Sequence, residues 1–299
     1  MNVLVTGGSG FIGSNLIKEL VLRDDISSIT VIDTEIFGRK QLTQSEKVVY
    51  YVDTILNETL LSKVLKKIDI VFHLAALISV AGSLNDPINY VNVNVLGTLI
   101  LLEKCKEYKI KHFIFSSSCA AEFCNSHYSV DKLSSEKYIN LYNSFFKTTI
   151  LRYFNVYGNN QDPFKEYAAA VPIFVCNALN NQDIQIYGDG NQTRDFVSVL
   201  DVVKANIHCM EKGVTGKFNV GSGVSTSIND LANLIKTTCL KINPTGRSKL
   251  IYHLERHGDT KEINCDNSKL IETGFKFSVS LKDGISDFIE QINSKKVFH

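Results

Sequence analysis

Short runs of apolar residues alternate along the first half of the chain with longer segments in which apolar residues recur at helical spacing. The strand-like runs are 3–5, 28–33, 48–52, 70–74, 113–115 and 149–153, and the helix-like segments are about 11–23, 58–67, 87–107 and 128–146. This alternation is typical of βαβ units, in which each helix returns the chain to a parallel strand through a right-handed crossover. It predicts an α/β fold with a doubly wound parallel sheet.

The second half of the chain predicts fewer elements. Residues 218–223 form a further strand-like run, which we expect to return the chain to the sheet. Ser227 stands where an N-capping side chain would begin a helix, and a final helix is predicted at about 281–293. These later segments indicate a smaller C-terminal α/β lobe.

A glycine-rich turn separates the first strand from the first helix. Gly7, Gly10 and Gly13 follow a G-x-x-G-x-x-G spacing. A side chain at the first two would block the sharp turn or the approach of a phosphate, and one at the third would hold the helix off its strand. Amide groups at the helix start favour a pyrophosphate, although turns also collect glycine for steric reasons alone. The turn predicts a dinucleotide site.

A carboxylate ends the second strand and narrows the choice of dinucleotide. Asp33 lies twenty positions after Gly13, where a Rossmann unit uses an acid to accept the adenosine ribose hydroxyls and to repel a 2′-phosphate. Arg39 and Lys40 could hold such a phosphate, but Asp33 outweighs them. We therefore predict NAD and not NADP.

Charge and cysteine usage restrict the partners and the compartment. The 32 basic and 31 acidic residues leave no net field that would attract nucleic acid or a membrane. The seven cysteines are odd in number and contain no C-x-x-C pair, which argues against a disulfide framework and a zinc site. We expect no metal, since the histidines show no ligand spacing either. Without a signal sequence or an apolar run of membrane length, we expect a soluble cytoplasmic protein.

The segment from His73 to Thr98 carries a resemblance to a known family. It contains His-Leu-Ala-Ala at 73–76, Asp86-Pro87 and Asn-Val-Leu-Gly-Thr at 94–98. Together with the glycine turn, this segment resembles the extended short-chain dehydrogenases/reductases, and among them the NAD-dependent nucleotide-sugar epimerases and dehydratases. Asp86-Pro87 is also a good helix start, and Asn94 could merely satisfy a buried backbone group. The resemblance extends to about residue 290.

The resemblance implies two domains that bind different ligands. It implies an NAD-binding Rossmann domain at 1–165, completed by about 195–223, and a nucleotide-sugar-binding lobe formed by 166–194 and 224–299. The implied cofactor-binding residues are Gly7, Gly10, Phe11, Ile12, Gly13, Asp33, Asp53, Thr54, Leu74, Ala75, Ala76, Asn94, Ser116, Tyr128, Lys132 and Phe154.

The chemistry is predicted at the end of the fifth strand and the start of the next helix. Tyr128 and Lys132 are four residues apart and thus on one helical face, where an ammonium would lower the pKa of the phenol from its usual value of about 10. Such a pair also arises by chance on solvated helices. The resemblance implies that Ser118 binds the reacting sugar oxygen, that Tyr128 acts as base and then acid, and that Lys132 also holds the nicotinamide ribose.

The segment between Ser118 and Tyr128 departs from the family pattern. It has nine residues, 119–127, where most relatives have a longer segment with a Tyr-Gly pair and prolines. We expect the short loop to leave the sugar pocket more open, or to let a neighbouring segment cover it. Cys119 and Cys124 are interpreted as small buried apolar residues and not as nucleophiles.

Substrate-binding residues are implied mainly beyond residue 150. The resemblance implies Ser118 and Tyr128 at the sugar, Tyr187 along the uracil, and Asn155, Arg194, Arg256 and Asp259 around the diphosphate and ribose. A guanidinium suits a pyrophosphate because its fork donates two parallel hydrogen bonds. Arg194 could instead pair with Asp195 or Asp189, and residues 256–259 could be a charged surface turn. Ile263 falls where relatives gate an acetamido group, and its intermediate size decides little.

The residues directly after Ser118 indicate the type of reaction. Dehydratases of this family carry an Asp-Glu pair there, whereas this chain has Cys119-Ala120, which provides neither acid nor base. Glu122 is out of register but could substitute. We predict 4-epimerisation of a UDP-hexose, N-acetylated or not, as in nucleotide-sugar metabolism for polysaccharide biosynthesis. The alternatives are another nucleotide-sugar oxidoreductase or dehydratase, or a non-catalytic NAD-binding sensor.

The resemblance also implies a homodimer. In relatives the helices corresponding to 87–107 and 128–146 pair across a two-fold axis in a four-helix interface. Apolar residues on these helices could equally face the sheet of their own subunit: Leu99, Leu102, Leu141 and Phe145.

Overall fold

A computed structural model describes residues 1–34, 42–164, 169–255 and 260–296. The chain divides into two compact units. The first consists of Met1–Tyr153 and Val203–Asn219, and the second of Phe154–Val202 and Val220–His299. Among the described residues, no helix has both the length and the apolar character needed to cross a bilayer.

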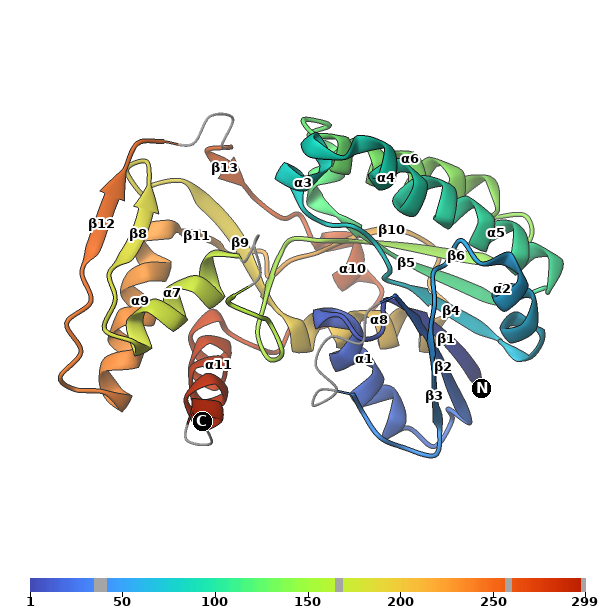
Figure 1. Cartoon of the computed structure of the whole chain (residues 1–299), viewed down its shortest axis with the longest axis horizontal. Helices are drawn as coiled ribbons and strands as arrows, with labels where there is room; N and C mark the ends of the chain where they lie inside the picture. Colours follow the sequence, from blue (N-terminus) through green and yellow to red (C-terminus); the bar gives the residue numbers. More distant parts are fainter. Residues whose placement is uncertain (35–41, 165–168, 256–259, 297–299) are drawn as a thin grey trace. The chain divides into compact units, whose positions relative to one another are not determined.

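A seven-stranded sheet forms the centre of the first unit (Figure 1). Its strands, in spatial order, are β10 (Gly216–Val220), β6 (Lys147–Tyr153), β5 (His112–Ser118), β4 (Ile70–His73), β1 (Asn2–Thr6), β2 (Ser28–Asp33) and β3 (Val48–Val52). All pairings from β6 to β3 are parallel. The order reverses at β1 and β4, so the strand ends there form a topological switch point. The doubly wound α/β fold is confirmed.

Helices connect these strands much as the apolar periodicity predicts. They are α1 (Phe11–Val21), α2 (Glu58–Val64), α3 (Val80–Asn85), α4 (Pro87–Val91), α5 (Gly97–Glu107), α6 (His127–Leu141) and α8 (Val199–Lys212), the last of which begins in the second unit. The predicted helix 87–107 is divided by a π-helical turn at Asn92–Leu96. Leu61, Leu101 and Phe113 are fully buried in the core cluster beneath these helices.

The second unit is built on two small sheets. A four-stranded sheet has the order β11 (Ser225–Ser227), β9 (Thr193–Ser198) and β13 (Glu262–Ile263), and β7 (Asn155–Tyr157) also pairs with β9. β12 (Leu250–His253) pairs with β8 (Ile184–Tyr187). The helices are α7 (Ala170–Leu179), α9 (Ile228–Ile242), α10 (Ser268–Glu272) and α11 (Leu281–Lys296). The Ser227 hydroxyl accepts a hydrogen bond from the Asp230 amide, so the predicted N-cap of α9 is confirmed.

Candidate functional site

Two of the three spaced glycines are required by the protein itself. Gly7 has φ +71°, and a Cβ there would lie 2.6 Å from the backbone nitrogen of Ala75. A Cβ on Gly13 would lie 2.3 Å from the carbonyl oxygen of Gly7. Both distances are far below van der Waals contact, so any side chain would force the turn away from β4 or α1 away from the turn. The steric roles predicted for these two positions match the structure.

Gly10 and Ser9 show that the loop fits a dinucleotide. Gly10 has φ −72°, which any residue adopts, and an added Cβ would meet only the Gly7 carbonyl oxygen, at 3.2 Å. Packing within the protein therefore explains this glycine poorly, whereas close approach of a phosphate explains it well. The hydroxyl of Ser9 is buried and has no hydrogen-bond partner among the residues that the structure describes, although buried polar groups nearly always have one. The loop thus has the small residue and the polar atom that a bound pyrophosphate would use.

The two predicted acids hold the chain near the ends of β2 and β3. A carboxylate oxygen of Asp33 accepts a hydrogen bond from the Ser9 amide at 2.9 Å, which ties the glycine loop to β2. Asp53 accepts hydrogen bonds from the Thr54 amide at 2.7 Å and from the Asn57 side chain at 2.8 Å. Both acids therefore shape the strand ends. Their contacts with the adenosine stay predictions.

Asn94 and a chain of buried hydroxyls fix the segment after β4. The Asn94 side chain accepts from the Leu77 amide at 2.9 Å and donates to the Leu77 carbonyl at 3.0 Å, so it satisfies buried backbone groups, the alternative weighed from the sequence. The hydroxyl of Thr98 donates to the Asn94 carbonyl at 2.6 Å. His73 Nε2 lies 2.9 Å from that hydroxyl, and its Nδ1 lies 2.7 Å from the Thr6 hydroxyl.

The predicted catalytic residues converge at the end of β5. The Ser118 side chain lies near Tyr128 and favours the charged form of its phenol, and Tyr128 is 9% exposed. Lys132 lies one turn further along α6, where its ammonium donates to the Ser116 carbonyl at 2.8 Å and lies 4.7 Å from the centre of the Phe115 ring. The three residues are thus neighbours in one unit, as their spacing predicts.

The pKa of the tyrosine differs from our expectation. Burial raises the pKa of Tyr128 to about 12, and the nearby Ser118 side chain opposes this rise. Burial lowers the pKa of Lys132 to about 8, although Glu136 and Asp131 favour its charged form. The expectation that Lys132 lowers the pKa of the phenol is therefore wrong for this structure, in which desolvation dominates and the ammonium bonds to Ser116.

The short loop after Ser118 is well defined. It begins with the 3₁₀ turn η4 (Cys119–Glu122), and the Ser126 hydroxyl accepts a hydrogen bond from the Ser129 amide at the start of α6. Glu122 forms an ion pair with Arg152 at 2.6 Å, a role that the sequence did not indicate. Cys119 is half-buried and Cys124 is exposed, so the interpretation of both as buried apolar residues is wrong.

The predicted substrate residues of the second unit lie on its sheets. Tyr187 ends β8, is 38% exposed and stacks at a tilt on His253, with ring centres 5.3 Å apart. The Asn155 side chain donates to the Asp195 carbonyl at 3.1 Å. Arg194 lies opposite Thr226 and Ile263 in the four-stranded sheet.

The two aspartates considered as partners of Arg194 bind other groups. Asp195 accepts from the backbone amides of Ser222 and Gly223, and Asp189 accepts from Asn191. Among the remaining predicted residues, Phe154 is buried and its amide donates to the Val220 carbonyl at 3.1 Å. Arg256 and Asp259, like Arg39 and Lys40, lie outside the described residues.

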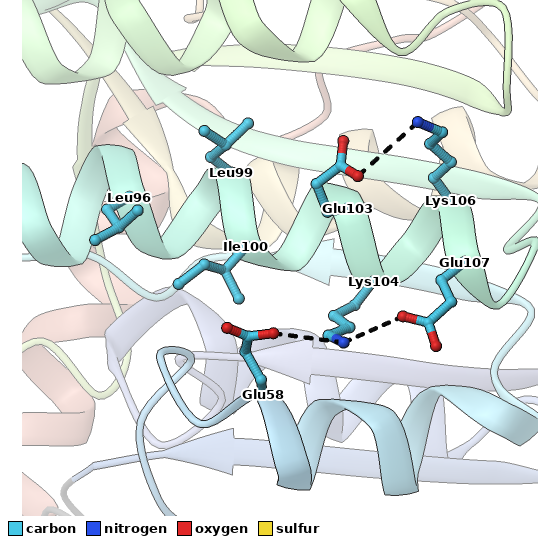
Figure 2. A pocket seen from close by; sticks show the side chains of 8 residues that line it. All are labelled: Glu58, Leu96, Leu99, Ile100, Glu103, Lys104, Lys106 and Glu107. Carbon is cyan, nitrogen blue, oxygen red and sulfur yellow. Dashed lines mark hydrogen bonds and ion pairs between the residues drawn. The ribbon is translucent and has the colours of Figure 1, made fainter.

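A hollow of about 640 Å³ lies along α5 and is bordered by Glu58 of α2 (Figure 2). None of the predicted site residues that the structure describes lines it. Its charged side chains pair with one another, with Lys104 bound to Glu107 at 3.1 Å and to Glu58 at 3.5 Å. In the described part of the chain, no three His, Cys, Asp or Glu side chains come together as a metal site.

The fold and these residues define a class of protein. A glycine loop at the switch point of a doubly wound sheet, together with adjacent Ser, Tyr and Lys side chains, is the arrangement of a dinucleotide-dependent enzyme that moves a proton and a hydride. The chain belongs to the NAD dependent epimerase/dehydratase family, whose sequence model matches residues 3–221. The family resemblance and the expected cofactor, NAD, are thereby confirmed.

Individual relatives cover nearly the whole chain. A putative UDP-glucose 4-epimerase of Methanocaldococcus jannaschii is 36% identical over 95% of both chains. The structure of a UDP-glucose 4-epimerase of Thermotoga maritima with UDP-glucose has a TM-score of 0.91 and 34% identity, covering 99% of this chain and 100% of that one. A UDP-N-acetylglucosamine 4-epimerase of Methanobrevibacter ruminantium, in complex with UDP-N-acetylmuramic acid, has a TM-score of 0.90 and 36% identity over 98% of both chains. Nucleotide-sugar dehydratases and decarboxylases also occur among the relatives.

Proposed function

We propose that the chain is an NAD-dependent 4-epimerase of a UDP-hexose. The observation that carries the proposal is the convergence of Ser118 at the end of β5 with Tyr128 in the first turn of α6, with Lys132 one helical turn beyond. A sensor that only bound NAD would have no use for this arrangement. The relatives named as 4-epimerases along the whole chain support the same interpretation.

The proposed chemistry assigns one role to each side chain. Bound NAD supplies a hydride acceptor and donor at C4 of the sugar. Ser118 binds the C4 oxygen, and Tyr128 removes the proton of the C4 hydroxyl and later returns it. Lys132 holds the nicotinamide ribose. Because the 4-keto sugar rotates before the hydride returns, the configuration at C4 inverts.

The residues of the second unit are proposed to hold the nucleotide. The exposed Tyr187 ring suits stacking along the uracil, and Arg194 suits the diphosphate because a guanidinium donates two parallel hydrogen bonds. Asn155 is assigned to the same diphosphate. Arg256 and Asp259 are proposed for the diphosphate and the ribose from the resemblance alone. The division into an NAD-binding and a sugar-binding part is a proposal of the same kind.

Dehydration is disfavoured by the residues after Ser118. Cys119 and Ala120 provide no acid or base, and Glu122 is engaged by Arg152 at 2.6 Å, so its carboxylate is an ion-pair partner and poorly suited to proton transfer. A decarboxylase or another oxidoreductase of the same family is the second candidate, since such enzymes occur among the relatives.

The test is incubation of the purified protein with UDP-GlcNAc and, separately, with UDP-glucose, without added cofactor. We expect the C4 epimer by NMR with no net NADH, since the hydride returns to the sugar. The relative rates with the two sugars identify the substrate. Bound NAD without an epimer from either sugar would contradict the proposal for these substrates and favour the second candidate.

We further propose that the chain acts as a homodimer in the cytoplasm. Val130, Leu141 and Phe145 on and just after α6 are 46%, 71% and 54% exposed, whereas Leu102 is buried in the core of its own unit. An exposed apolar face of this kind fits the two-fold helix pairing implied by the resemblance. The seven free thiols suit a reducing compartment. A monomeric mass in sedimentation equilibrium would contradict the dimer.

A further inference from the structure

A buried cluster of charged side chains joins β5, β6 and α6. Arg152 on β6 donates from Nε and Nη2 to the two carboxylate oxygens of Glu136 on α6, both at 2.7 Å. Ser117 donates to the same carboxylate at 2.6 Å. The side chains of Arg152 and Glu136 are 6% and 3% exposed, so they form a bidentate pair largely shielded from water.

The third nitrogen of the same guanidinium reaches the short loop. Nη1 of Arg152 donates to Glu122 at 2.6 Å, and the Glu122 side chain is 42% exposed. Glu136 binds Arg152 and also lies 3.9 Å from the ammonium of Lys217, so Glu122 supplies a second carboxylate to a cluster that contains two cations. Its contact ties the loop to a rigid strand.

Glu122 is only four residues from Ser118, and a single 3₁₀ turn joins them. Glu122 ends η4, and Ser118 caps its start, where the serine hydroxyl accepts from the Ala120 amide at 3.2 Å. Ala121 is buried at 1% exposure, whereas residues 122–125 are all exposed. Apart from the ion pair of Glu122, the outer part of the loop therefore has little packing to hold it. The backbone of Ser118 is fixed in β5 by its pairing with Tyr153, so a shift of Glu122 would act on the Ser118 hydroxyl through the Ala120 amide of η4.

We propose that Glu122 is a positioning residue for the reaction. Its ion pair with Arg152 holds η4, whose Ala120 amide binds the hydroxyl of Ser118 and so keeps that hydroxyl beside the phenol of Tyr128. This inference rests on the proposed function, because it assigns Ser118 and Tyr128 to the chemistry. It also explains how a loop of only nine residues keeps the serine in place.

The test compares Glu122→Ala and Glu122→Gln with a matched control, Glu211→Gln. Glu211 is 40% exposed and pairs with Arg23 at 2.7 Å, which closely resembles the pair of Glu122 with Arg152. We expect kcat to fall about 10-fold in Glu122→Ala and less in Glu122→Gln, with KM within about 2-fold of the wild type. The rising limb of kcat with pH should move to higher pH in both, because a displaced Ser118 no longer stabilises the phenolate. In the control Glu211→Gln, kcat, KM and the pH dependence of kcat should equal those of the wild type.

A second readout does not depend on activity. Cys119 follows Ser118 directly and is half-buried, so its rate of alkylation by iodoacetamide, followed by mass spectrometry, reports the position of η4. We expect faster labelling in Glu122→Ala and the wild-type rate in Glu211→Gln. Wild-type kcat, pH profile and labelling in Glu122→Ala would overturn the proposal. Suppose that the wild type forms no epimer while Cys119 labelling still becomes faster in Glu122→Ala. The ion pair of Glu122 with Arg152 then still positions η4, but the proposed function is wrong.

Discussion

Two connections of the large sheet carry the predicted chemistry, and they are built in different ways. The glycine loop between β1 and α1 is shaped by backbone, with Gly7 at φ +71° and Gly13 against the Gly7 carbonyl oxygen. The loop between β5 and α6 is shaped by side chains, above all the ion pair of Glu122 with Arg152 and the cap that Ser126 forms. One loop leaves no room for a side chain at Gly7 or Gly13, and the other depends on charges and hydroxyls.

The difference explains which loop can vary in length. A backbone cradle keeps its shape only if its spacing is kept, because each glycine lies against a particular carbonyl or amide. A loop held by side chains can lose residues and keep its ends in place when a new contact replaces the lost packing. This fits a glycine turn that follows the family pattern beside a catalytic loop that departs from it.

The largest effect should come from substitution of Tyr128, which lies in α6 directly after the loop between β5 and α6. Tyr128→Phe removes the hydroxyl that transfers the proton, and we expect kcat to fall by about 10² to 10⁴. Circular dichroism and the unfolding midpoint should match the wild type, because only one oxygen is removed. Tyr138→Phe on the same helix is the control. Retention of more than half of the activity in Tyr128→Phe would contradict the assigned role.

Smaller effects on stability and NAD binding should distinguish Gly13 from Gly10 in the loop between β1 and α1. Gly13→Ala should lower the free energy of unfolding by about 1–3 kcal/mol, since the new Cβ would lie 2.3 Å from a carbonyl oxygen. Gly10→Ala should cost less stability than Gly13→Ala, since its Cβ would lie 3.2 Å from a carbonyl oxygen, but it should weaken NAD binding about 10-fold or more. Denaturant titration and calorimetric NAD binding measure the two effects. Equal NAD affinity in wild type and Gly10→Ala would show that no phosphate approaches this glycine.

The smallest expected effect is a gain in stability. Lys132→Met should abolish epimerisation yet raise the free energy of unfolding by about 1–2 kcal/mol at neutral pH. Burial lowers the pKa of Lys132 from 10.5 to about 8, which corresponds to about 3 kcal/mol of destabilisation by the charged form. The variant also loses the hydrogen bond to Ser116 and the contact with the Phe115 ring, and these losses offset part of the gain.

The pH dependence of this gain has a definite sign. The folded wild type binds fewer protons at Lys132 than the unfolded chain between pH 8 and 10.5, so its stability rises with pH in that window. The advantage of Lys132→Met should therefore be full below pH 8 and shrink above it. Urea titrations at pH 7 and pH 9.5 measure the difference, and a constant gain would rule out the ammonium as its source.

Most of the fold could be predicted because apolar periodicity reflects burial directly. Strands β2 and β3 have the predicted bounds, and α1 ends within two residues of the prediction. The π-helical turn at Asn92–Leu96 could not be predicted, since its sequence continues the helical pattern and only tertiary contacts of Asn94 select it. The short strands β11 and β13 carry too few residues for a periodic pattern.

The candidate site could be predicted in part. Ser118 lies near Tyr128, and Lys132 reaches Ser116 of the same strand end from one turn further along α6, because strand end and helix face bring them together. The contact of Glu122 with Arg152 joins residues thirty positions apart and leaves no local signal. The pKa of Tyr128 depends on burial by the whole unit, which the sequence pattern does not report.

The hydrogen bonds through His73 make this residue useful for spectroscopy. The Thr98 hydroxyl donates its proton to the Asn94 carbonyl, so it accepts a hydrogen bond from Nε2 of His73. Nδ1 then accepts from the Thr6 hydroxyl, which assigns the tautomer with the proton on Nε2. Burial lowers the pKa of the imidazole to about 3, so it stays neutral throughout the physiological range. A ring proton sheltered in this way exchanges slowly with solvent and gives a separate downfield NMR resonance. Since Thr6 precedes the glycine loop and Thr98 belongs to α5, that single resonance reports whether their junction persists when a nucleotide is added.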